Sequence, residues 1–255
     1  PQPEEGRPSL YGRVYLSGFD PNIISFDNSP VQELMGKALE GKSTINPNGG
    51  IDFVTFEGSI DAKSLNVDKY EPTLLATACY TYFTVAGPQV CIDPDPYSTI
   101  SQKKVCEVKS ITLSNQGAPI AVTKIDEEAL ATKTQFRITI KNVGGGDIIK
   151  KEALTDDKCN PYGAKKLERE DIDKVALMGV IIGKDSLMCG PFAEGRTKDT
   201  VGFIRLINNE GTIICELPRT SYGDAKTAYT TPLNIRLSYI YKSTAERKLQ
   251  IKKEI

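Results

Sequence analysis

The segment that decides the predicted fold is YTTPLNIRLSYIYKSTAERKLQI (229–251), because an earlier segment, YEPTLLATACYTYFTVAGPQVCI (70–92), follows the same template without a gap. Identical residues recur at matching positions, which are Tyr70 and Tyr229, Leu74 and Leu233, Tyr80 and Tyr239, Tyr82 and Tyr241, Ala86 and Ala245, and Ile92 and Ile251. The two copies lie much farther apart in the sequence than the repeats of a solenoid, so they fit two homologous domains in tandem. The sequence therefore predicts two β-sandwiches, each ending in the same antiparallel hairpin.

Within the first copy, alternation places Tyr80 and Tyr82 on one face of a strand, with the return strand directing Val90 inward. If Tyr80 lies opposite Val90, then Cys79 lies opposite Cys91 on the other face, as a cross-hairpin disulfide requires. A bond between Cys91 and Cys106 is the alternative. In the second copy Ser238 and Gln250 replace these two cysteines, so the bond would belong to the first copy only.

The six cysteines include no C-x-x-C pair, so zinc ribbons and redox motifs lack support. An even number at wide spacing favours disulfides and hence an oxidising compartment, with buried thiols in a cytosolic protein as the alternative. We expect three bonds, of which the last follows only by elimination: Cys79–Cys91, Cys159–Cys189 and Cys106–Cys215.

Composition excludes several function classes. The chain has 255 residues, no histidine and no tryptophan, which removes Ser-His-Asp and Cys-His catalysis and the commonest zinc sites. A net charge of −1 gives no overall reason to bind nucleic acid. No pair of acidic residues stands out for glycoside hydrolysis. We therefore expect a protein that is not an enzyme, with no catalytic residue and no cofactor.

The domain organisation follows from turn signals and periodicity. A Pro/Glu-rich start, 1–8, is predicted to be a flexible stalk left after a leader or anchor was removed. The Pro-, Asp- and Gly-rich region 93–119 separates two immunoglobulin-like sandwiches, 9–103 and 108–255. The expected elements are strands at 9–16 and 51–61, a short helix at 29–41, a hairpin turning at Asn208 to Gly211 and an irregular insertion, 150–200, with a helix-like piece at 164–175.

The segment APIAVTKIDEEALATKTQFRITIKNVGGGDII (118–149) resembles the opening strands of cell-adhesion-related domains in bacterial and archaeal surface proteins. These domains show an apolar strand, a gap and an alternating strand that ends in Lys-Asn-x-Gly-Gly, here Lys141, Asn142, Gly144 and Gly145. The Tyr-x-Tyr segments and CIDPDPY (91–97) also resemble archaeal surface proteins. The resemblance implies an immunoglobulin-like, extracellular or cell-surface protein with a structural or adhesive role. The 150–200 insertion departs from the minimal module.

Two candidate metal ligands remain, Asp93 and Asp95 in IDPDPY, which could offer oxygens to calcium between tandem domains. Two carboxylates are few for a site of six to eight ligands, and the alternating prolines more simply make a stiff connection. The expected partners are other surface proteins or copies of this chain, with a membrane anchor outside this sequence. The alternative function is a subunit of an extracellular filament, in which the strand at 9–16 completes a neighbouring sheet.

Overall fold

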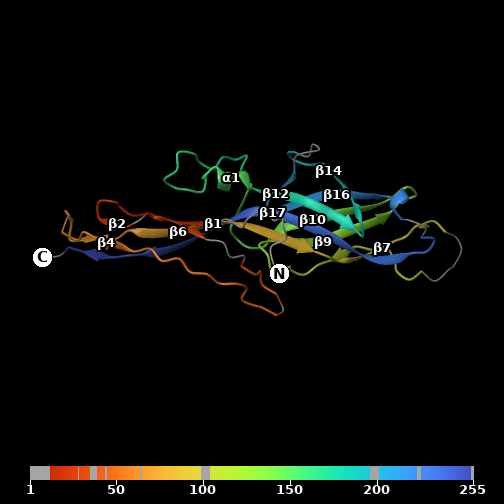
Figure 1. Cartoon of the computed structure of the whole chain (residues 1–255), viewed down its shortest axis with the longest axis horizontal. Helices are drawn as coiled ribbons and strands as arrows, with labels where there is room; N and C mark the ends of the chain where they lie inside the picture. The colour runs from red at the N-terminus through yellow and green to blue at the C-terminus, as the bar shows by residue number, and fades with distance from the viewer. Residues whose placement is uncertain are drawn as a thin grey trace.

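The computed structural model describes residues 12–27, 29–34, 39–43, 45–63, 65–98, 104–195, 201–222 and 225–253. The described chain is mainly β and elongated, with two packed sheets in one half and a narrower ribbon in the other (Figure 1). Helix is confined to α1 (Glu152–Thr155) and a single 3-10 turn, η1 (Arg219–Ser221), within the described residues. The mainly β prediction is confirmed at this level, and tandem immunoglobulin-like domains are not.

The larger sheet has nine described strands in the path β13-β12-β17-β6-β1-β3, and β7, β11 and β15 pair with β17 or β12 outside that path. Its strands are β1 (Gly12–Ser17), β3 (Val31–Leu34), β6 (Thr73–Ala86), β7 (Gln89–Ile92), β11 (Asp147–Ile149), β12 (Lys174–Ile182), β13 (Asp185–Ser186), β15 (Gly202–Arg205) and β17 (Tyr229–Lys248). Strands from both predicted domains belong to this one sheet, and the two groups meet where β17 pairs with β6, so the predicted boundary does not divide the strand pairing into two separate units.

The smaller sheet has five described strands in the order β14-β16-β10-β9-β8. They are β8 (Ile111–Thr112), β9 (Ile120–Ala129), β10 (Lys133–Asn142), β14 (Met188–Gly190) and β16 (Glu210–Pro218). Two further pairs lie in the ribbon half: β2 (Ile24–Phe26) with β4 (Gly58–Ile60), and β5 (Lys69–Tyr70) with β18 (Ile251–Lys252).

The main core lies between the two sheets. Alternating side chains of β9, β10 and β16, such as Phe136, Ile138 and Ile213, pack against those of β12 and β17, such as Val180 and Ile235. Each of these side chains is almost fully buried. Strands that alternate in this way bury one face each, which is why two antiparallel sheets stack as layers.

The repeated segments do not form two hairpins, and that prediction was wrong. Residues 229–248 form one strand, β17, which runs antiparallel to β6 and β7, and β18 after it pairs with β5. Tyr70 opposes Ile251 at one end, and Ile92 opposes Tyr229 at the other. The two segments therefore pair with each other along their whole length, around a local two-fold axis between Thr81 and Ile240.

This pairing accounts for the recurrence of the central tyrosines. Close to a local two-fold axis, equivalent positions of two antiparallel strands have similar neighbours, so the same kinds of residue fit both. Tyr80 opposes Tyr241 and Tyr82 opposes Tyr239. The four rings form one cluster, with centroid distances of 6.2 Å between Tyr80 and Tyr82 and 5.9 Å between Tyr80 and Tyr241. These four tyrosines pack at the main core.

The predicted helix at 29–41 is wrong for the part that the structure describes. Val31–Leu34 is the edge strand β3, which pairs with β1 from Tyr15 opposite Val31 to Gly12 opposite Leu34. Ser29 does accept a hydrogen bond from the Val31 N–H (3.1 Å), but it begins a strand rather than a helix. Pairing with β1 outweighs the weak local helix preference. Residues 35–38 lie outside the described residues.

The other predicted elements are partly confirmed. β1 corresponds to the described part of the strand expected at 9–16, and residues 1–11 lie outside the described residues. Only Gly58–Ile60 of the expected 51–61 strand pairs as β4. The turn at Asn208 and Asn209 is present, and both residues have positive φ. However, β15 before this turn belongs to the larger sheet and β16 after it to the smaller one. The turn is therefore a corner between layers.

The insertion covers the outer face of the larger sheet. Leu154 of α1 packs with Tyr15 and Ile240 in a second, smaller core. The helix-like piece predicted at 164–175 is irregular up to β12, so that prediction was wrong. Lys158 holds this region through Asp171, with Nζ 2.8 Å from Oδ2. The insertion also contains β12, whose side chains are mostly buried.

Candidate functional site at the junction of the two sheets

The candidate site lies where β7 ends beside β9. Ile92 is fully buried, and the chain continues into Asp93 and the proline-bearing segment after it. The disulfide Cys91–Cys106 closes this segment, with a Cα–Cα distance of 5.8 Å and a sequence separation of 15. The bond ties Cys106 to β7 of the larger sheet, and loop residues such as Asp93 and Lys104 line a hollow with Glu127 of β9 in the smaller sheet.

Asp93 organises this loop through an ion pair. Its side chain is buried, and its Oδ2 accepts a hydrogen bond from Lys104 Nζ at 2.5 Å. Its Oδ1 accepts a hydrogen bond from the Asp95 N–H at 3.0 Å. Lys104 Nζ also donates to the Asp95 carbonyl oxygen at 2.9 Å. Asp93 and Lys104 thus tie the start of the loop to its end.

The two sequence-predicted ligands are therefore used differently from a metal site. Both oxygens of Asp93 have protein donors, and the Asp95 backbone, rather than its carboxylate, takes part in the network. Over the described ranges, no group of three or more His, Cys, Asp or Glu residues is arranged to hold a metal ion. The arrangement is that of an ion pair that closes a loop.

Glu127 is the residue that sequence reasoning missed. It is 9 % exposed, and its Oε2 accepts a hydrogen bond from the Cys91 N–H at 3.2 Å. Its Oε1 is buried without a hydrogen-bond partner. Burial raises the pKa of the Glu127 carboxyl to about 7, and the Cys91 hydrogen bond opposes this increase. The available signal was its position two residues after Ile125, which places it on the inward face of β9.

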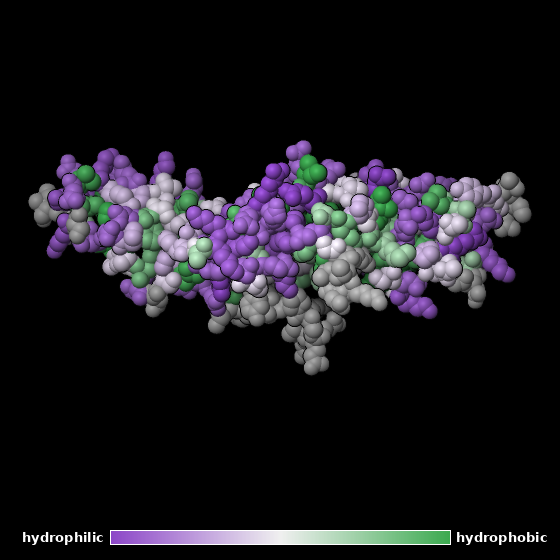
Figure 2. Space-filling model, turned by 90° about the horizontal axis from the view of Figure 1, so that it is seen from above, coloured by the Kyte–Doolittle hydropathy of each residue, from purple (hydrophilic) through white to green (hydrophobic). Residues whose placement is uncertain are grey.

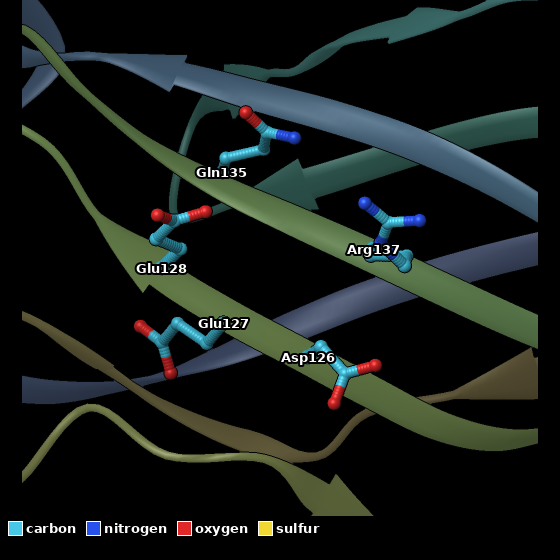
Figure 3. A pocket seen from close by; sticks show the side chains of 5 residues that line it. All are labelled: Asp126, Glu127, Glu128, Gln135 and Arg137. Atoms are coloured by element: carbon cyan, nitrogen blue, oxygen red, sulfur yellow. The ribbon is translucent and has the colours of Figure 1, made fainter.

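Two shallow hollows adjoin Glu127. One of about 270 Å³ is lined by Asp126, Glu127, Glu128, Gln135 and Arg137 (Figure 3). The second, of about 350 Å³, lies between the end of β9 and the disulfide-closed loop, and is lined by Asp93, Pro96, Lys104, Cys106, Glu107, Val108, Glu127, Glu128 and Ala129. The carboxylate of Glu127 and the guanidinium of Arg137 point away from each other in Figure 3. The chemistry available at this site is the binding and release of a proton by the Glu127 carboxyl.

All six cysteines are paired, but none of the three predicted partners is correct. The observed bonds are Cys79–Cys159, Cys91–Cys106 and Cys189–Cys215. Cys79–Cys91 fails because both residues lie on one continuous extended run, where twelve residues span about 40 Å. The bond Cys91–Cys106, left as the alternative, is the one present.

The predicted bonds Cys159–Cys189 and Cys106–Cys215 are wrong because these cysteines lie in different layers of the fold from their predicted partners. Cys159 lies in the core on the outer face of the larger sheet, where it meets Cys79 at a Cα–Cα distance of 6.5 Å. Cys189 and Cys215 are direct cross-strand neighbours on β14 and β16, with Cα atoms 4.0 Å apart. Elimination could not find these partners because each depends on which layer a strand joins.

The surface over the insertion is polar. Figure 2 shows hydrophilic residues gathered over the middle of this face, with apolar residues in small scattered groups. Among the described residues, no helix is long and apolar enough to cross a membrane. No protein-family model, curated protein or solved structure matches this chain.

Proposed function

We propose that this chain is an extracellular or cell-surface protein with a structural or adhesive role and no enzymatic activity. The observation that carries the proposal is that every cysteine is bonded and that the three bonds lie in three different parts of the fold. Such complete pairing is typical of proteins that fold in an oxidising compartment. The elongated shape adds support, because a rod-like molecule suits a stalk or spacer (Figure 1).

The immunoglobulin-like character of the sandwich is part of this proposal. The segment that resembles cell-adhesion-related domains covers β9, β10 and β11, and its Lys-Asn-x-Gly-Gly ending is a tight turn. In this turn Asn142 Oδ1 accepts a hydrogen bond from the Gly144 N–H at 3.1 Å, and Gly145 has a φ of 78°. A positive φ favours glycine there, which supports the physical basis of the motif.

The alternative of a filament assembled by strand exchange gains no support from β1. This strand pairs on one side with β6, from Gly12 opposite Tyr80 to Ser17 opposite Leu75, and on the other side with β3 of the same chain. Arg13 and Tyr15 also bind Asp157 of the insertion. Partners for this protein remain other surface proteins or further copies of the chain, held through surfaces other than β1.

The experiment that tests the proposal is accessibility labelling of intact cells. An antibody raised against the folded protein should bind intact source cells, or the medium should contain the protein, without lysis. A cytosolic marker labelled only after lysis is the control. Detection only after lysis, together with six alkylatable thiols in protein denatured without reductant, would overturn the placement.

A further inference from the structure

Glu127 connects the two sheets at a place where strand pairing stops. β7 pairs with β17 along one edge, and the Leu233 N–H donates to the Pro88 carbonyl oxygen at 2.9 Å. In an antiparallel ladder this hydrogen bond fixes the pattern, so the Cys91 N–H points to the opposite edge of β7. No described strand pairs with that edge, and Glu127 Oε2 accepts the Cys91 N–H instead. One side chain from β9 thus takes the place of a missing strand.

Only one of the two oxygens of the Glu127 carboxyl has a hydrogen-bond partner. Its second oxygen, Oε1, is buried and has no partner. A buried charged group without full hydrogen bonding costs far more than a neutral one. The neutral acid can still accept the Cys91 N–H through its carbonyl oxygen while the other oxygen carries the proton. Burial of Oε1 without a partner therefore favours the protonated form, and it outweighs the Cys91 hydrogen bond, which favours the carboxylate.

The charged groups around Glu127 do not compensate for it. Asp93, Glu107 and Glu128 line the adjacent hollow with the same sign of charge, and Lys104 is committed to Asp93. On the same sheet, Asp126 is paired with Lys124 at 2.7 Å, and Arg137 of β10 points away. Tyr222, which follows η1, interacts electrostatically with Glu127. Burial is the main cause that raises the pKa of the Tyr222 hydroxyl. The charges of Glu127 and Asp93 raise this pKa further, and the charge of Arg219 lowers it. No described cation contacts the Glu127 carboxylate.

We propose that Glu127 is a proton-operated latch, in which the neutral acid holds β9 against β7 and the disulfide-closed loop, and loss of the proton loosens this junction. The direction of the pH dependence follows from the raised pKa. A carboxyl with a folded-state pKa near 7 and an ordinary value of 4.5 binds more protons when folded than when unfolded between those pH values. Its stabilisation is complete below pH 4.5 and is lost as pH rises towards about 7. The latch is therefore closed in mildly acidic surroundings and looser above neutrality.

Amide hydrogen exchange on the full disulfide-bonded chain tests the latch, because the Cys91 N–H is itself the reporter. After correction for intrinsic exchange, we expect protection of the Cys91 amide to fall by about tenfold or more between pH 5 and pH 8. The Glu127→Gln variant, which mimics the neutral acid, should show a flat profile. Glu210→Gln, which removes an exposed carboxylate on β16 of the same sheet that is paired with Lys141, should keep the wild-type profile.

Two outcomes would overturn the proposal. One is a wild-type Cys91 amide whose corrected protection does not change with pH, and the other is a Glu127→Gln variant that keeps the full wild-type change. Should Glu127→Gln fail to fold, carbon-detected titration of the wild-type Glu127 carboxyl decides instead. A midpoint near 7 supports the latch, and a midpoint near the ordinary 4.5 rejects it.

Discussion

Tyr82 stacks on Tyr239 across the paired strands β6 and β17, with ring centroids 5.8 Å apart and an angle of 13° between the ring planes. The two residues oppose each other near the local two-fold axis, and Tyr80 and Tyr241 form the equivalent pair. Three of these hydroxyls bind backbone of the segments at 117–120 and 144–146. The aromatic cluster therefore anchors two turns of the smaller sheet to the centre of the larger one.

Loss of the Tyr239 hydroxyl should destabilise the protein. This oxygen accepts a hydrogen bond from the Ile120 N–H at 3.0 Å and lies 3.0 Å from Thr84 Oγ1. The Tyr239→Phe variant leaves the buried Ile120 N–H without its acceptor, and we expect a loss of about 1–3 kcal/mol in the free energy of unfolding. Urea denaturation measures it. Tyr80→Phe is the matched control, because its hydroxyl bonds no described residue, and an equal loss in both variants would contradict the assignment.

The disulfide pattern can be mapped directly. Digestion without reduction, followed by mass spectrometry, should yield linked peptides for Cys79–Cys159, Cys91–Cys106 and Cys189–Cys215. Replacing Cys91 and Cys106 by serine together should lower stability by about 3 kcal/mol, as expected for a loop of this length. Recovery of a Cys79–Cys91 peptide would show that these two residues do not lie on one extended run.

Glycine at position 117 should resist substitution for a steric reason as well as a conformational one. Its φ is 75°, and a Cβ there would collide with the Lys42 carbonyl oxygen. Gly145 has a similar φ of 78° but opens to free space. We expect Gly145→Ala to cost about 1 kcal/mol and Gly117→Ala at least about 2 kcal/mol more. Thermal or urea unfolding separates the two effects, and equal costs would mean that residues 39–43 do not pack at this turn.

Asp157 should hold β1 in place. Its Oδ1 accepts hydrogen bonds from Arg13 Nη1 at 2.7 Å and from the Tyr15 hydroxyl at 3.2 Å. Asp157→Asn removes the charge and tolerates the positive φ of 56° at this position. Because the ion pair is about one-third exposed, the expected loss is only about 1 kcal/mol.

Amide exchange should locate that loss. β1 amides should exchange faster in Asp157→Asn than in Glu33→Gln, which removes the more exposed partner of Arg13. The Tyr15 pKa, raised to about 12 mainly by burial and further by Asp157, should fall in Asp157→Asn. An unchanged Tyr15 titration would show that the insertion does not contact β1 in solution.

The candidate site shows how far sequence pattern reaches. Glu127 was missed because a glutamate on a strand is normally solvated. Its position on the same face of β9 as Ile125 was the only signal, and only the packing of β7 shows that it is buried. Asp93 was singled out from its own motif, but its partner Lys104 lies at the other end of the loop that the disulfide closes. The spacing of neighbouring residues cannot predict the Asp93–Lys104 ion pair, because the pair depends on the path by which the loop comes back to Asp93.

The sequence by itself determined the strand-forming character of β6, β9, β10 and β17, since period-two alternation is a property of neighbouring residues. It also determined the echo between 70–92 and 229–251. Only the tertiary structure decided that these segments pair with each other rather than fold back as two hairpins. Strands expose the same backbone donors and acceptors to any neighbour, so the choice of partner, and with it all three disulfides, depends on which faces the whole chain buries together.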